Sequence, residues 1–185
     1  MVMVKQLSTA ELEAGLDEIR RSPTDHGVLE MIVRRPTIGE RELIQEGRLD
    51  LVEGLLGDSW RARGSASSPD GSASPDAQIT IMNSRAALLI AQTRQHMPLA
   101  GDQLYMDLDI GAANLPPGTH LAIGAAILEV SDKPHTGCKK FVARYGLDAM
   151  EFVNSPVGRE LHLRGINTRV VQPGLIHVGD TVRKL

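Results

Sequence analysis

Residues 164–185, "RGINTRVVQPGLIHVGDTVRKL", alternate short apolar runs with turn signals. The pattern predicts a strand, a Pro-Gly turn, a second strand, a Gly-Asp turn and a final strand. Upstream, "QLYMDLDI" (103–110) alternates as a strand does, and a Pro-Pro-Gly turn at 116–118 precedes further strands. Short strands at such close spacing favour a closed or partly closed β-barrel over a doubly wound parallel sheet.

Helical patterns occur at three places outside these strands. Residues 8–22 read as a helix that Ser8 caps, with Glu11 completing a capping box. "SRAALLIAQTRQ" (84–95) and "KFVARYGLDAMEFVNSP" (140–156) are also helix-like, the latter broken at Gly146. The expected fold class is therefore mostly β with peripheral helices, either all-β or α+β.

One domain over residues 1–185 accounts for the length of the chain. The stretch "RARGSASSPDGSASPDAQ" (61–78) predicts a mobile Ser/Gly/Pro loop inside that domain. We expect a surface excursion and not a domain linker, because the segment before it is too short for a core of its own. Periodicity leaves residues 41–50 open between a short helix and an edge strand.

The composition narrows the function classes. Aromatic residues make up only 3% and the formal charge is −3, which speaks against a nucleic-acid or acidic-membrane partner. The single cysteine cannot form an internal disulfide, as is typical of a reducing compartment. With no signal peptide and no apolar run of about 20 residues, we expect a soluble cytoplasmic protein.

The only cysteine, Cys138, lies in the polar stretch "PHTGCKKF" (134–141). A free cysteine is often a buried space-filler, but a loop this polar has little reason to be buried. Lys139, Lys140 and His135 are close in sequence, and cations beside a thiol favour the reactive thiolate. A structural cysteine and a functional one that attacks an electrophile, carries sulfur or binds a soft metal both remain open.

Four segments in a fixed order resemble the MOSC domain family, which is related to the C-terminal domain of molybdenum cofactor sulfurases. They are "GLLGD" (54–58), "GDQLYMDLDI" (101–110), "NLPPGTHLAIGAAILEVSDKPHTGCKKF" (114–141) and "LRGINTRVVQPGLIHVGDTV" (163–182). The resemblance implies a closed, barrel-like fold. It also implies that Cys138 is the residue that carries sulfur or ligates molybdenum when the molybdenum cofactor (molybdopterin) is bound.

Two departures limit what the resemblance implies. Many family members have Pro directly before the cysteine, whereas this chain has Gly137 and looks like a branch of small stand-alone bacterial proteins. The chain also lacks the aminotransferase-like domain of the full sulfurases. We therefore do not expect it to bind pyridoxal phosphate.

Several residues are candidates for holding the cofactor around Cys138. Arg164 and Arg169 flank "GINT", and an arginine there could hold a pterin phosphate bidentately. Residues five apart on one strand point to opposite faces, so only one of the two need face the cysteine. Asp58 and Asp180 each follow a glycine and are interpreted as turn formers. The full candidate set for cofactor binding is His135, Lys139, Lys140, Arg164, Arg169 and Asn167.

Two function classes follow from these residues. The first is a sulfur carrier or molybdenum-cofactor-binding protein whose partner is a sulfur donor or a molybdoenzyme. Whether it catalyses sulfur transfer or cofactor-dependent redox chemistry stays open. The alternative is a non-catalytic barrel with a structural cysteine that binds a small anionic ligand or a partner protein. Substrate and oligomeric state are not determined by the sequence.

Overall fold

A computed structural model describes residues 5–65 and 68–185. The described strands are β1 Gly27–Arg34, β2 Glu42–Ile44, β3 Glu46–Asp50, β4 Gly54–Leu55, β5 Ile79–Asn83, β6 Leu104–Asp107, β7 His120–Ile123, β8 Ala126–Val130, β9 Ile166–Gln172, β10 Gly174–His177 and β11 Thr181–Lys184. The described helices are α1 Thr9–Glu13, α2 Leu16–Arg20, α3 Trp60–Arg63, α4 Ser84–Ala91, α5 Lys139–Tyr145, α6 Leu147–Asn154 and α7 Pro156–Glu160, with 3₁₀ helices η1 Pro75–Ala77 and η2 Arg94–Ala100.

Seven strands form a closed mixed barrel, which confirms the predicted architecture. They run in the order β11-β7-β8-β9-β5-β6-β1, and pairing of β1 with β11 closes the ring. β5 and β6 are parallel, and the other neighbours are antiparallel. Register shifts in β1 and β8 mark irregularities of the kind that lets a sheet bend into a closed barrel.

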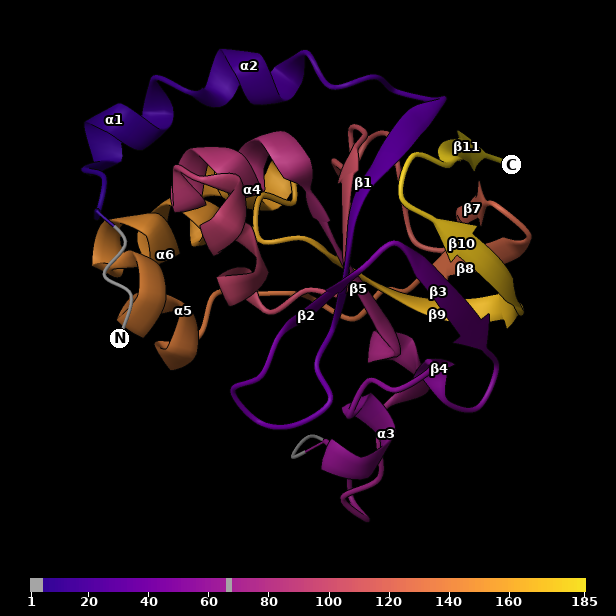
Figure 1. The fold of residues 1–185 in the computed structure, drawn as a ribbon. Coiled ribbons are helices and arrows are strands. Elements are labelled where there is room, and N and C mark those ends of the chain that lie inside the picture. Colours follow the sequence, from indigo (N-terminus) through magenta and orange to yellow (C-terminus); the bar gives the residue numbers. More distant parts are fainter. Residues whose placement is uncertain (1–4, 66–67) are drawn as a thin grey trace.

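The barrel wall separates two apolar clusters. Alternate residues of β8 are buried, so one face of the strand points into the barrel interior with Leu121 and Ile123 of β7. The second cluster lies between the barrel and the helices and includes Tyr105, Phe141 and Phe152. Figure 1 shows α4, α5 and α6 together on one side of the barrel, and β3, β4 and β10 as a small sheet on the other.

The C-terminal half follows the sequence pattern closely. β9, β10 and β11 are the three strands predicted from residues 164–185, and Gly146 separates α5 from α6 as expected. The undecided stretch 41–50 contains no helix and instead holds β2 and β3. β2 pairs with the preceding strand β1, whereas β3 pairs with β10 far along the chain, a contact that local periodicity cannot indicate.

The N-terminal segment contains two short helices where the sequence predicts one. Ser8 and Glu11 form the expected capping box at α1. Gly15 then begins α2, and a Cβ there would lie only 2.5 Å from the side chain of Leu89. A side chain at this point would displace Leu89 of α4, and glycine also weakens a continuous helix.

The Ser-rich stretch 61–78 is not wholly irregular. The last residues of α3 and all of η1 fall inside it, while residues 66–67 lie outside the described residues. Its mobility stays a prediction. In the described part of the chain, no helix is both long and apolar enough to cross a membrane.

Candidate functional site

The loop between β8 and α5 brings Cys138 to the surface. Cys138 is exposed and occupies the N-cap position of α5. The side-chain amide of Asn167 donates hydrogen bonds to the carbonyl oxygens of Lys133 (3.0 Å) and Pro134 (3.2 Å). The backbone N–H of Gly137 donates to Asn154 Oδ1 at 3.0 Å. The barrel strand β9 and helix α6 thus hold both ends of the loop.

Gly137 has a packing role that its sequence position did not reveal. A Cβ at this residue would come within 3.1 to 3.2 Å of the side chains of Met150, Val153 and Asn154. The glycine therefore lets the loop lie close to α6.

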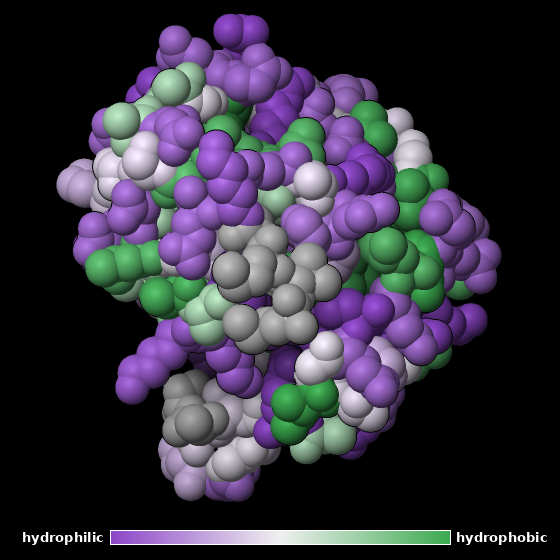
Figure 2. Space-filling model, turned by 60° about the vertical axis from the view of Figure 1, so that its left-hand side comes forward, coloured by the Kyte–Doolittle hydropathy of each residue, from purple (hydrophilic) through white to green (hydrophobic). Residues whose placement is uncertain are grey.

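Cys138 lines a cavity of about 790 Å³ whose charged residues are cationic. The cavity lies between the barrel, α5 and the segment around α3, and Figure 2 shows this hollow between the main body and the smaller lobe below it. No aspartate or glutamate is among its described lining residues. The cationic lining residues are Arg35, Arg41, Arg63, Lys140, Arg144 and Arg164.

Two of these arginines form ion pairs with buried carboxylates that do not line the cavity. Arg35 donates to both carboxylate oxygens of Asp58 at 2.8 Å, and the Asp58 side chain is 0% exposed. Arg164 donates to Asp102 Oδ2 at 2.7 Å, and Asp102 is also 0% exposed. The interpretation of Asp58 as a turn former is therefore incomplete. Its carboxylate accepts from the backbone N–H of Trp60, as a turn former would, and it also binds the buried guanidinium of Arg35.

Three other arginines have no carboxylate partner among the described residues. Arg41 and Arg144 donate only to backbone carbonyls, those of Pro98 and Glu40 for Arg41 and that of Leu99 for Arg144. Burial lowers the pKa of Arg41, and the nearby Arg144 and Arg35 charges lower it further. Arg63 is exposed at the surface, but partial desolvation lowers its pKa, the Arg35 charge acts in the same direction, and the Asp58 charge opposes the shift. Crowded cations, three of which form no ion pair among the described residues, create a positive potential that favours an anionic ligand.

His135 belongs to the cysteine loop and faces the buried Asp102–Arg164 pair. Its Nδ1 is 3.5 Å from Asp102 Oδ1, and its side chain is 16% exposed. Burial lowers the pKa of His135 from 6.5 to about 4, and the Arg164 charge acts in the same direction. Asp102 opposes this shift, but burial and Arg164 outweigh it. His135 is therefore neutral near pH 7.

This neutral histidine predicts a pH dependence of stability. The unfolded chain binds a proton at His135 below about pH 6.5, whereas the folded chain does so only near pH 4. Stability is then fully present above pH 6.5 and is lost as the pH falls toward 4, by at most about 1.4 kcal/mol per pH unit. In urea unfolding between pH 4 and 7, the free energy of unfolding of His135→Gln should fall less steeply with decreasing pH than that of the wild type. Equal slopes would assign the effect to another group.

The structure brings four of the predicted site residues to one cavity. Cys138, His135, Lys140 and Arg164 all line it. Lys139, in the first turn of α5, is exposed and is not among the lining residues. Asn167 anchors the loop instead of lining this cavity.

Arg169 does not line this cavity. It forms an ion pair with Glu129 on the neighbouring strand β8, and it lies 3.8 Å from the carboxylate of Asp76. Of the two arginines that flank "GINT", only Arg164 lines the Cys138 cavity.

Sequence reasoning missed the cations that come from other parts of the chain. Arg35, Arg41, Arg63 and Arg144 line the cavity, together with the buried Asp102 behind it. The one local signal was "RARG" at 61–64, which borders the Ser-rich stretch. The others reach the site only through the fold.

The arrangement defines a class of protein: a closed mixed β-barrel with an exposed cysteine beside a cationic cavity. The family model of the MOSC domain matches residues 56–183, and the chain belongs to the MOSC domain family. This family is known for proteins like the C-terminal domain of molybdenum cofactor sulfurases. No curated protein matches the chain.

Solved structures share the fold at low sequence identity. YuaD from Bacillus subtilis is 16% identical with a TM-score of 0.61, and the match covers 85% of this chain and 94% of that one. YiiM from Escherichia coli is 19% identical with a TM-score of 0.55, and the match covers 85% of this chain and 69% of that one. Similarity at this level supports the barrel fold alone.

Proposed function

We propose that this protein binds the phosphate-bearing pterin of the molybdenum cofactor in the Cys138 cavity and uses Cys138 as a sulfur carrier or metal ligand. The observation that carries the proposal is the position of the single cysteine. It lines a cavity with six cationic residues and no carboxylate among the described lining residues. Membership of the MOSC domain family supports this choice of cofactor.

The cavity residues fit such a group by charge and chemistry. Arg41, Arg63 and Arg144 would hold the phosphate, because a guanidinium binds phosphate oxygens bidentately and these three have no carboxylate partner among the described residues. Arg164 and His135 form the wall nearer the barrel. A cysteine sulfur suits a soft metal. When bound, the cofactor supplies a redox-active molybdenum centre or accepts the sulfur.

Cys138 itself performs the sulfur step in the carrier version. Its thiolate attacks the outer sulfur of a donor persulfide, a new S–S bond forms at Cys138, and the donor leaves as a thiolate. Exposure of Cys138 allows a partner protein to deliver that sulfur.

A second function uses the same cavity without the cysteine. Its cations would bind a small anion by charge alone. In that case Cys138 is incidental. Cys138 is exposed, so it does not fill space in the core.

Analysis of the purified protein tests the proposal. The protein is produced in a host able to make the cofactor, and molybdenum, pterin and cyanolysable sulfur are measured per chain. Molybdenum with pterin supports the cofactor version, and cyanolysable sulfur alone supports the carrier version. None of the three, with an intact and monodisperse protein, contradicts both and leaves the anion-binding function.

A matched pair of arginines on α3 tests the cavity. Arg63 lines it, whereas Arg61 forms an ion pair with Glu53 and does not. Pyrophosphate serves as a probe of the phosphate site in calorimetric titrations. Arg63→Gln should weaken pyrophosphate binding about tenfold, because a charge-assisted bidentate contact is lost. Arg61→Gln should change it less than about twofold. Similar losses in both variants would point to a general charge effect.

A further inference from the structure

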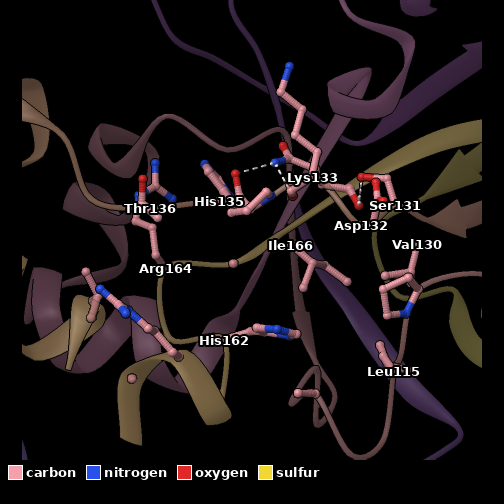
Figure 3. A pocket seen from close by; sticks show the side chains of 18 of the residues that line it. Leu115, Val130, Ser131, Asp132, Lys133, His135, Thr136, His162, Arg164 and Ile166 are labelled. Atoms are coloured by element: carbon pink, nitrogen blue, oxygen red, sulfur yellow. Dashed lines mark hydrogen bonds between the residues drawn. The ribbon is translucent and has the colours of Figure 1, made fainter. Parts of the chain in front are cut away.

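A second cavity lies on the other side of the cysteine loop. Its volume is about 400 Å³, within the usual range for small-molecule sites. It shares only His135 and Arg164 with the Cys138 cavity, so these two side chains form a wall between the cavities. Figure 3 shows His135 and Arg164 on one side of this second cavity and Leu115 and Val130 on the other.

One part of the cavity is apolar. Leu115, Val130 and Ile166 line it and are at most 4% exposed. They belong to the apolar cluster inside the barrel, so their positions are fixed by packing. A rigid apolar wall of this kind accepts the ring or chain of an organic molecule, because burying that surface is favourable.

His162 offers a hydrogen-bond acceptor at this cavity. Its Nδ1 lies 2.7 Å from the carbonyl oxygen of Ile110. Since a carbonyl only accepts, Nδ1 carries the hydrogen, and in the neutral imidazole Nε2 keeps a lone pair. Nε2 has no hydrogen-bond partner among the described residues. Figure 3 shows the His162 ring between Arg164 and Leu115, where a hydroxyl or N–H of a ligand could donate to it.

The charges at the cavity favour an acid. Lys133, Arg159 and Arg164 line it against a single carboxylate, Asp132. Arg164 is already neutralised by Asp102. Arg159, in the last turn of α7, is exposed and has no carboxylate partner in the described part of the chain. It lies three residues before His162, so the anion-binding group and the acceptor come from the same turn.

We propose that this second cavity binds a small organic acid with an apolar body and a hydroxyl or amino group. Its ring or chain packs on Leu115, Val130 and Ile166. Its carboxylate pairs with Arg159, and its hydroxyl or amino group donates to Nε2 of His162. This site is additional to the proposed cofactor cavity and does not depend on Cys138.

Calorimetric titration with 6-hydroxy-2-naphthoate tests the site. This probe has a fused aromatic ring, one carboxylate and one hydroxyl. Ala112 is exposed and lines the cavity, whereas its neighbour Ala113 is exposed and does not. Ala112→Trp should obstruct the cavity and weaken binding by at least about tenfold, while Ala113→Trp should leave it unchanged. Unfolding midpoints establish that both variants fold.

Charge variants complete the test. Arg159→Gln should weaken binding about tenfold, whereas Arg48→Gln, at an exposed arginine that lines neither cavity, should have no effect. Arg63→Gln, in the Cys138 cavity, should also have no effect. The proposal is overturned if the wild type does not bind the probe or if the matched variants behave alike. Loss of binding on Arg63→Gln would also overturn it, since the probe would then occupy the Cys138 cavity.

Discussion

Cys138→Ser is expected to abolish cyanolysable sulfur and molybdenum retention while leaving the fold intact. A serine hydroxyl cannot form a persulfide and is a poor ligand for a soft metal, so loading should fall to background. Cys138 is exposed and makes no side-chain cap to α5. Serine is a favoured N-cap residue, so the free energy of unfolding should change by no more than about 0.5 kcal/mol.

The two measurements on this variant separate the functions. A structural cysteine would give a destabilised protein with unchanged loading, and that result would end the functional interpretation. Pyrophosphate titration adds a third reading. Unchanged pyrophosphate affinity in Cys138→Ser, together with lost sulfur, would show that the arginines hold the anion while the cysteine does the sulfur chemistry.

Asp58→Ala is expected to cause the largest loss of stability. Arg35 is 7% exposed at its side chain and donates twice to Asp58. Removing the carboxylate leaves a buried cation without its partner, which costs about 3–5 kcal/mol. For a domain of this size the thermal midpoint should fall by roughly 10 °C. The backbone N–H groups of Arg35 and Trp60 also lose their acceptor, which adds to the effect.

A neighbouring surface pair provides the control. Arg34 and Glu42 approach to 2.7 Å, but their side chains are 35% and 46% exposed. Glu42→Ala should therefore cost no more than about 1 kcal/mol, because water replaces the lost partner. Combining Asp58→Ala with Arg35→Met should recover part of the lost stability. No recovery would mean that the lost backbone contacts, not the buried charge, are responsible.

The sequence determined the local elements and the candidate nucleophile. Period-two alternation and Gly-containing turns over residues 164–185 correspond to β9, β10 and β11, because strand geometry and turn conformation depend on neighbouring residues. Polarity around Cys138 correctly indicated that its thiol would be accessible. The capping box of Ser8 and Glu11 is equally local.

Only the tertiary structure decided which charges surround that cysteine. Arg35, Arg63 and Arg144 come from segments far apart in the chain and meet Cys138 because the barrel closes and α5 packs beside it. The same holds for Asp58, whose role as the buried partner of Arg35 depends on a contact across 23 residues. Long-range pairing depends on how the strands and helices pack, and a single sequence records no distances between them. A local pattern therefore identified the exposed cysteine, while the folded chain supplied the cationic cavity beside it.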